Sequence, residues 1–263
     1  MSKLLTNYLG FFSVLISVLS LVNIIYCYYF NIYLNIDTYI YTLLTSLSLG
    51  FGLLFFKNKV TKITIFHKIL TVILGYFLIP LIISIPYYLS IYNISLLDCY
   101  FEAISGFTST GFSIFENIKH LDQSLILWRS STQWIGGLYF LISLILLIDI
   151  FDTNLKKSLT NFISFSSSET LKQSFKISFI YLILTAVIFL LLSISGIRIF
   201  DSFNLSLTLI SSGGFLPDND LNLIIDSKFQ QFTLSISMLL SFFSLFLLYN
   251  LFFIFNYFIN RHI

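Results

Sequence analysis

Charged residues are scarce in this sequence. Asp, Glu, Lys and Arg make up 10% of its 263 residues, against about 25% in a soluble domain, which needs them to solvate its surface. The composition therefore excludes a water-soluble globule. The net charge of +2 is also too small, and the Lys and Arg residues too dispersed among loops, for a protein that binds nucleic acid.

Residues that bind metals or act as nucleophiles are scarce as well. The two cysteines, Cys27 and Cys99, show no CxxC or Cys/His spacing, so we expect neither a metal centre nor a disulfide framework. No apolar segment carries a Gly-x-Ser-x-Gly motif with a partner histidine, or paired aspartates at membrane depth. The sequence thus argues against an enzyme and indicates no cofactor.

Long apolar segments are abundant, since 57% of the residues are hydrophobic. About 20 apolar residues are needed to cross the hydrocarbon layer of a membrane as a helix. The first segment lacks a small-residue cleavage site, so we expect a retained span and no signal peptide. The sequence predicts an all-α polytopic membrane protein with six spans, near residues 8–30, 39–56, 66–90, 124–150, 177–197 and 229–258.

Six spans place both termini on one side of the membrane. Most of the basic residues then share that side, whereas Lys119, Arg129, Arg198 and Lys228 lie on the other. By the positive-inside rule the termini are cytoplasmic, and we expect a multi-pass protein of the cell inner (plasma) membrane. The acidic residues gather on the outer side, where they either concentrate cations at a pore mouth or form an ordinary solvated surface.

Two outer segments, 96–115 and 199–216, are too short to cross the membrane and end in clusters of Ser, Thr and Gly. This pattern predicts re-entrant loops, in which a half-helix enters the membrane and the chain returns in extended form. Non-helical backbone is tolerated at that depth only where protein buries it or water lines it, because unpaired peptide groups in lipid are costly. Two such loops indicate a cavity or pore.

The two segments are also copies of one another, as a shift of 103 residues shows. Asp98 falls on Asp201, and Gly111 falls on Gly214. The flanking spans coincide under the same shift, so the repeated unit is span, re-entrant loop, span. We therefore predict three parts: an N-terminal transmembrane helix pair at 1–60, a first helix–pore loop–helix repeat at 61–155 and a second at 156–263.

A dehydrated potassium ion needs oxygens in place of its hydration shell, and the backbone carbonyls of converging strands supply them. Such strands need glycine, because they adopt dihedral angles that other residues resist. One isolated cluster of small residues is more simply a tight turn, but two copies behind half-helices favour a selectivity filter. The candidate ion-binding residues are Thr108, Ser109, Thr110, Gly111 and Phe112 in the first loop, and Ser211, Ser212, Gly213, Gly214 and Phe215 in the second.

We expect the half-helices at about 97–106 and 200–209. Their C-terminal ends carry a partial negative charge that favours a cation. Asp98 and Asp201 lie at the opposite ends, where we expect their carboxylates to cap free N–H groups and to offset the positive pole of the helix.

Glu102 in the first half-helix and Arg129 at the start of the next span are ionisable groups at membrane depth, which usually pair. We hypothesise an ion pair that braces the first filter; the alternative is that both side chains extend separately to outer water. In the same span, Gly136 and Gly137 would let two helices approach closely.

These residues resemble a known family. The stretch Phe101 to Phe112, followed by Trp128 to Ser130 and Gln133 to Gly137, resembles the first pore loop and following helix of the Trk/Ktr/HKT-type potassium transporters. The segment from Phe200 to Phe215 is similar to the second pore loop of that family, and the resemblance covers about 66–230. It implies a potassium channel or transporter in which the filter glycines favour potassium over sodium.

The resemblance also implies partners. The family works with a cytoplasmic nucleotide-binding regulatory subunit, which the inner loop 152–176 would dock unless that loop is only a solvated linker. Family members carry four repeats, whereas this sequence carries two. Two filter strands cannot surround a dehydrated ion, so we expect a working pore to need a second copy of the chain or a partner chain with the missing repeats. The alternatives are a non-conducting accessory subunit and an inactive remnant of a potassium transporter.

Overall fold

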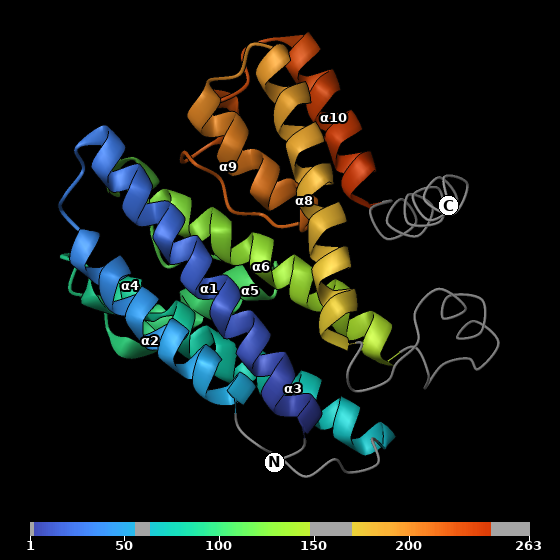
Figure 1. The fold of residues 1–263 in the computed structure, drawn as a ribbon. Coiled ribbons are helices and arrows are strands. Elements are labelled where there is room, and N and C mark those ends of the chain that lie inside the picture. Colours follow the sequence, from blue (N-terminus) through green and yellow to red (C-terminus); the bar gives the residue numbers. More distant parts are fainter. Residues whose placement is uncertain (1–2, 56–63, 148–169, 243–263) are drawn as a thin grey trace, which may run out of the picture.

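The structure is a computed structural model that describes residues 3–55, 64–147 and 170–242. Within these ranges all regular elements are helices, as expected for an all-α membrane protein. The helices form two groups, α1 to α6 and α8 to α10, and α6 packs against members of both (Figure 1). This central position of α6 is what brings the two repeats together.

Two long helices, α1 (Lys3–Phe30) and α2 (Ile36–Phe55), form the N-terminal pair. They pack most closely at two glycines. A methyl group at Gly50 would lie 2.7 Å from Val14 Cγ2 and 3.2 Å from the carbonyl oxygen of Gly10. The missing side chains therefore let the two backbones approach, as small residues do at membrane helix interfaces.

The first repeat consists of α3 (Ile65–Ile83), α4 (Ile85–Leu89), α5 (Leu96–Phe107), the 3₁₀ turn η1 (Ile118–His120) and α6 (Gln123–Leu147). The single span expected at 66–90 is thus two helices, which meet at Ser84. Pro86 accounts for the break, because proline has no N–H and its ring clashes with the carbonyl group four residues earlier in a helix.

The second repeat has α8 (Thr170–Ile194), α9 (Ile199–Ile210), the 3₁₀ turn η3 (Leu221–Leu223) and α10 (Lys228–Phe242) in a matching order. The half-helices predicted at 97–106 and 200–209 correspond to α5 and α9, each 12 residues long. At 1.5 Å per residue such a helix is about 18 Å long, too short to cross the hydrocarbon layer. The prediction of a short helix in each of these segments is confirmed, and their entry into the membrane stays a prediction.

Four helical segments are long and apolar enough to cross a membrane: Leu4–Phe30, Ile36–Phe55, Ile65–Leu89 and Ser174–Ile194. The span expected at 124–150 corresponds to the helix α6, in which Arg129, Gln133 and several hydroxyl residues lie among the apolar ones. These polar side chains are buried in protein, so lipid does not meet them. Of the span expected at 229–258, the structure describes only the part up to Phe242.

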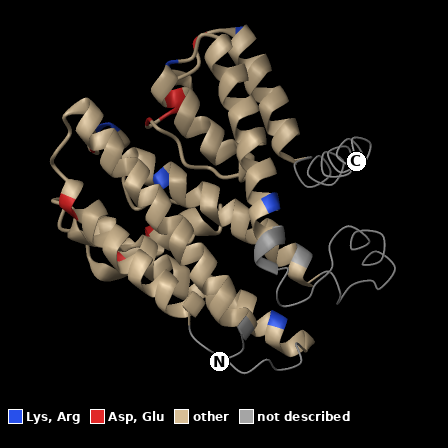
Figure 2. Ribbon diagram, in the orientation of Figure 1, with Lys and Arg blue, Asp and Glu red and all other residues tan. Residues whose placement is uncertain are grey.

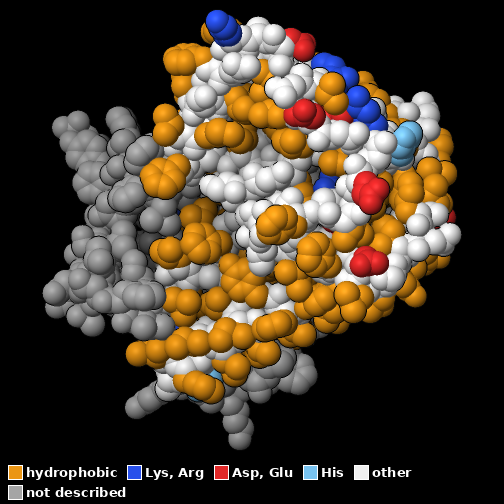
Figure 3. Space-filling view, turned by 180° about the vertical axis from the view of Figure 1, so that it is seen from behind, with side chains coloured by type: hydrophobic (Ala, Val, Ile, Leu, Met, Phe, Trp, Pro, Cys, Tyr) orange, Lys and Arg blue, Asp and Glu red, His pale blue; other side chains and the backbone are white. Residues whose placement is uncertain are grey.

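The outer surface suits a lipid environment. Charged residues are few along the ribbon (Figure 2), and much of the face seen in Figure 3 is hydrophobic. Many of the lysines that predict cytoplasmic termini lie outside the described residues, as does most of the loop 152–176. The orientation of the chain therefore stays a prediction.

We predict that Gly50→Val lowers stability, because the new side chain would collide with Val14 and with the α1 backbone. Overpacking of this kind costs about 1–3 kcal/mol. Gly52→Val is the matched control, since no atom lies within 4 Å of a methyl group added on this residue of the same helix. Thermal unfolding in detergent measures both variants, and equal melting temperatures would contradict the close packing of α1 and α2.

Candidate functional site

Both half-helices end in the same turn. Ser109 after α5 and Ser212 after α9 have φ values of 56° and 55°, in the left-handed region. The shift of 103 residues relates the hydrogen bonds of the two turns. In the first turn, the Ser109 N–H donates to the Gly106 carbonyl (3.0 Å) and the Thr110 N–H to the Ser105 carbonyl (3.0 Å). In the second turn, the Ser212 N–H donates to the Leu209 carbonyl (2.8 Å) and the Gly213 N–H to the Thr208 carbonyl (2.8 Å). Each turn is a Schellman motif, which ends the helix and redirects the chain. The internal duplication thus extends to backbone geometry.

The candidate filter residues, Thr108–Phe112 and Ser211–Phe215, form these turns and the irregular backbone after them. The two loops touch each other at their glycines. Gly111 has a φ of 84°, and a methyl group on it would lie 2.7 Å from the Cα atom of Gly214. Glycine is needed at Gly111 both because this φ disfavours other residues and because the neighbouring loop leaves no room for a Cβ atom.

Most backbone carbonyl oxygens of these loops have no hydrogen-bond donor within the described residues. Among the described residues, no N–H or hydroxyl group donates to the carbonyl oxygens of residues 108–111 or 211–214. Phe112 is different, because its carbonyl accepts a hydrogen bond from Ser105 Oγ. Unpaired carbonyls are costly against lipid, so these loops must face water, protein or an ion.

The C-terminal ends of both half-helices pack against two glycines of α6. A methyl group at Gly136 would overlap the carbonyl oxygen of Phe107, the last residue of α5. One at Gly137 would lie 2.8 Å from the Cα atom of Ser211, which directly follows α9. The glycine pair allows close approach, as the sequence suggested, and the helices concerned are the two half-helices. Because helix C-terminal ends carry partial negative charge, their meeting creates a negative potential beside the loops.

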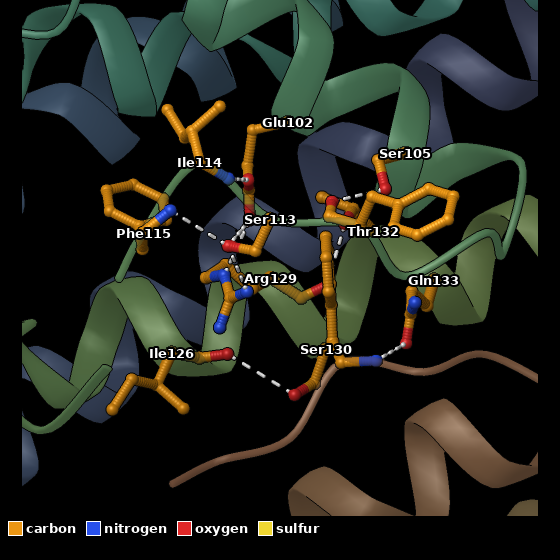
Figure 4. A network of polar contacts seen from close by, with 12 residues as sticks. Glu102, Ser105, Ser113, Ile114, Phe115, Ile126, Arg129, Ser130, Thr132 and Gln133 are labelled. Carbon is orange, nitrogen blue, oxygen red and sulfur yellow. Dashed lines mark hydrogen bonds and ion pairs between the residues drawn. The ribbon is translucent and has the colours of Figure 1, made fainter. Parts of the chain in front are cut away.

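Glu102 and Arg129 form an ion pair behind the first loop (Figure 4). Arg129 Nε donates to Glu102 Oε1 at 2.8 Å, and the two side chains are 1% and 0% exposed. The structure therefore brings them together as the pairing hypothesis requires, and neither extends to outer water. The Ile114 N–H donates to Glu102 Oε2 at 2.9 Å, and the hydroxyl group of Ser113 bonds to both members of the pair.

Arg129 also reaches the second loop. Its Cζ atom lies 4.2 Å from the centroid of the Phe215 ring, a cation–π contact. One turn further along α6, Gln133 Oε1 accepts the Phe215 N–H at 3.1 Å. Gly213 packs on the same amide group, where a Cβ atom would overlap it. One helix therefore positions the loops of both repeats.

The outer ends of the two loops are joined as well. Asn219 Oδ1 accepts the Ile118 N–H at 2.6 Å, and Asn219 Nδ2 donates to Asn117 Oδ1 at 2.9 Å. Lys119 Nζ lies 3.7 Å from Asp218 Oδ1. These contacts link residues about a hundred positions apart and hold the loops in a fixed relation.

The N-terminal ends of the half-helices differ from the expectation. Ser95 is the N-cap of α5; its hydroxyl accepts the Asp98 N–H at 3.2 Å and donates to the Asp98 carboxylate at 2.7 Å. Arg198 stands at the N-cap position of α9, and its Nε donates to Asp201 at 2.6 Å. Both aspartates lie in the first turn, where they offset the helix dipole without capping the helix.

Sequence reasoning assigned no role to Ser113 or Asn219, and it named Gln133 only as part of the motif that carries the family resemblance. An amide in an apolar span, such as Gln133, indicates a buried polar contact, but the hydroxyl residues beside it on α6 give the same indication. Ser113 and Asn219 lie in polar loops, where nothing in the local sequence distinguishes a contact with a distant residue from solvation.

Comparisons with known proteins identify relatives of this chain. No protein-family model matches the sequence. An uncharacterised cation transporter of Methanocaldococcus jannaschii is 31% identical over 198 residues, which cover 72% of this chain and 41% of that protein. The Trk system potassium uptake protein TrkH of Escherichia coli is 27% identical over 135 residues, which cover 47% of this chain and 27% of that protein.

A solved structure has the same fold. The crystal structure of the potassium transporter TrkH from Vibrio parahaemolyticus matches with a TM-score of 0.71 at 20% sequence identity, over 89% of this chain and 48% of that one. The chain is a homologue of the Trk potassium uptake proteins. The resemblance seen in the pore-loop motifs is thus confirmed. The chain spans less than half the length of these Trk relatives.

We predict that neutralising one member of the buried pair destabilises this Trk homologue. Glu102→Gln or Arg129→Gln leaves the other charge buried and unpaired, which costs about 3–5 kcal/mol. The double variant should lose less than the sum of the two single losses, because it retains no uncompensated charge. Unfolding in detergent measures the coupling between the two sites, and strictly additive losses would contradict it.

Arg198→Gln is the control for this experiment. The Arg198 side chain is 71% exposed, whereas its partner Asp201 is 4% exposed. Solvent around the arginine screens this pair, so this variant should unfold closer to the parent protein than either single variant of the fully buried pair.

Proposed function

We propose that this chain forms part of a membrane pore that conducts potassium ions. The observation that carries the proposal is the set of unpaired carbonyl oxygens at residues 108–111 and 211–214, in two duplicated loops that meet at Gly111 and Gly214. Carbonyl oxygens that converge on one axis replace the hydration shell of a potassium ion, so passage needs no covalent chemistry.

The electrostatics of the site support a cation. The C-terminal ends of α5 and α9 meet at Gly136 and Gly137, and their partial negative charges add near the loops. The positive charge of Arg129 would oppose this field, but Glu102 neutralises it at 2.8 Å. The names of the relatives support the choice of ion, since they are a potassium uptake protein and a cation transporter.

The described loops supply oxygens from two strands, whereas a filter surrounds its ion with several. We therefore propose that a second copy of the chain, or a partner chain with similar loops, supplies the others. The distribution of lysines supports cytoplasmic termini in the inner (plasma) membrane. A nucleotide-binding regulatory subunit at the cytoplasmic face stays a prediction of the family resemblance.

We predict that Gly111→Ala abolishes potassium uptake. The added methyl group would lie 2.7 Å from Gly214 Cα, so one loop must move away from the other. An activation barrier raised by about 1.4 kcal/mol lowers a rate about tenfold. We expect the displacement of a loop to raise the barrier for ion passage by more than this. Growth of potassium-uptake-deficient cells at low potassium, and rubidium uptake into them, measure the effect when the chain is expressed.

Gly196→Ala is the matched control. Gly196 also has a positive φ, 89°, so alanine is strained there too, but the nearest atom to an added methyl group is 3.8 Å away. We expect this variant to retain uptake at equal membrane abundance. Equal growth with the Gly111 and Gly196 variants would reject the loops as the conducting site and favour an accessory subunit.

A further inference from the structure

We propose that a second copy of this chain docks its Phe112 against α10, on the surface that contains Phe232 and Ile236. The contact would repeat, between two copies, the contact that Phe215 makes with the first repeat within one copy. The inference rests on the proposed pore, because it names the partner that supplies the remaining loops and the residues through which that partner binds.

The template is the surface that holds Phe215, formed by Gly106, Arg129 and Gln133, which we call the first seat. Arg129 covers the Phe215 ring at 4.2 Å, and Gln133 accepts the Phe215 N–H at 3.1 Å. A methyl group at Gly106 would lie 3.1 Å from Phe215 Cε2, so glycine makes room for the ring. The first seat belongs to the first repeat, whereas its occupant belongs to the second.

The second repeat has an equivalent surface. Under the shift of 103 residues, the three positions of the first seat correspond to Leu209, Phe232 and Ile236, which we call the second seat. Leu209 is buried against the protein, whereas Phe232 is 63% exposed and Ile236 is 37% exposed. Within the described part of the chain, therefore, no phenylalanine fills the second seat as Phe215 fills the first.

The first loop has the complementary feature. Phe112 corresponds to Phe215 under the same shift, but Phe112 is 68% exposed and Phe215 only 2%. Lipid does not explain this exposure, because Phe112 follows directly on the backbone carbonyls of residues 108–111, and unpaired peptide groups do not face lipid. A large apolar ring beside polar backbone and water is typical of an interaction surface.

A second copy satisfies both features at once. Phe112 of each copy would enter the second seat of the other, and a two-fold axis would relate the two contacts, so the assembly closes with four loops. The second seat is apolar where the first has Arg129 and Gln133, and Phe232 offers Phe112 an aromatic partner. Both halves of the contact thus come from this chain, whereas an unrelated partner would have to supply its own phenylalanine and its own seat.

The test expresses two differently tagged full-length copies together in one membrane, one with Phe112→Cys and the other with Phe232→Cys. A ring contact leaves the two Cβ atoms farther apart than the roughly 3.5–4.5 Å that a disulfide needs, so we use dibromobimane, which joins nearby thiols. The native Cys27 and Cys99 are both buried, and each single variant with an unaltered copy measures their background. We expect a cross-linked product that carries both tags, at least several-fold above that background.

Met238→Cys is the matched control on α10. Met238 is 50% exposed, and six residues along a helix of 3.6 residues per turn rotate it about 120° from Phe232. We expect little product with Phe112→Cys and Met238→Cys. No product with the Phe232 variant, or equal product with the Met238 variant, would overturn the inference.

Potassium uptake measured in the same host strain, expressing the unaltered chain, separates this inference from the proposed function. Uptake by the unaltered chain without the specific cross-link would leave the pore in place and reject the second copy as its partner. A specific cross-link without uptake would support the docking surface and reject conduction by this chain.

Discussion

The buried ion pair between Glu102 and Arg129 is the interaction on which the arrangement of the two loops after α5 and α9 depends. The carboxylate holds the first loop through Ser113 and Ile114, while the guanidinium lies over Phe215 of the second loop. Neither charge has water around it, so the pair is tolerated only in a geometry in which hydrogen bonds satisfy the carboxylate. Moving the first loop would remove the hydrogen bonds that Ser113 and Ile114 donate to Glu102, and moving the second would remove the Phe215 ring from Arg129, so each loop is held against the buried pair.

The two repeats share backbone geometry but differ in what supports it. Leu205 and Phe232 stand in the second repeat where the first has Glu102 and Arg129. The first repeat is therefore braced by a polar network, and its helix α6 contacts both loops. The second repeat presents an apolar helix, α10, which packs against α8 and α9. This difference explains why Phe215 is buried, whereas the equivalent Phe112 is exposed.

Much of the architecture was predictable because it depends on local sequence. Apolar length predicted the long helices, and clusters of Ser, Thr and Gly behind short apolar segments predicted the half-helices and their loops. One detail that depends on competing local groups was wrong: Ser95 rather than Asp98 caps α5, and Arg198 rather than Asp201 stands at the N-cap position of α9. Contacts such as that between Gln133 and Phe215 could not be predicted from the sequence, because many polar residues of α6 have the same local sequence pattern.

The sequence by itself determined that this is a membrane protein of duplicated units, because composition and the shift of 103 residues require no knowledge of contacts. Its pore-loop motifs were enough to place it beside the Trk family. Only the tertiary structure decided that Gly111 lies against Gly214, and that Phe215 is enclosed while Phe112 is open. The two loops are nearly the same locally, so their different surroundings arise from which helix packs beside each one, and that is a property of the folded chain.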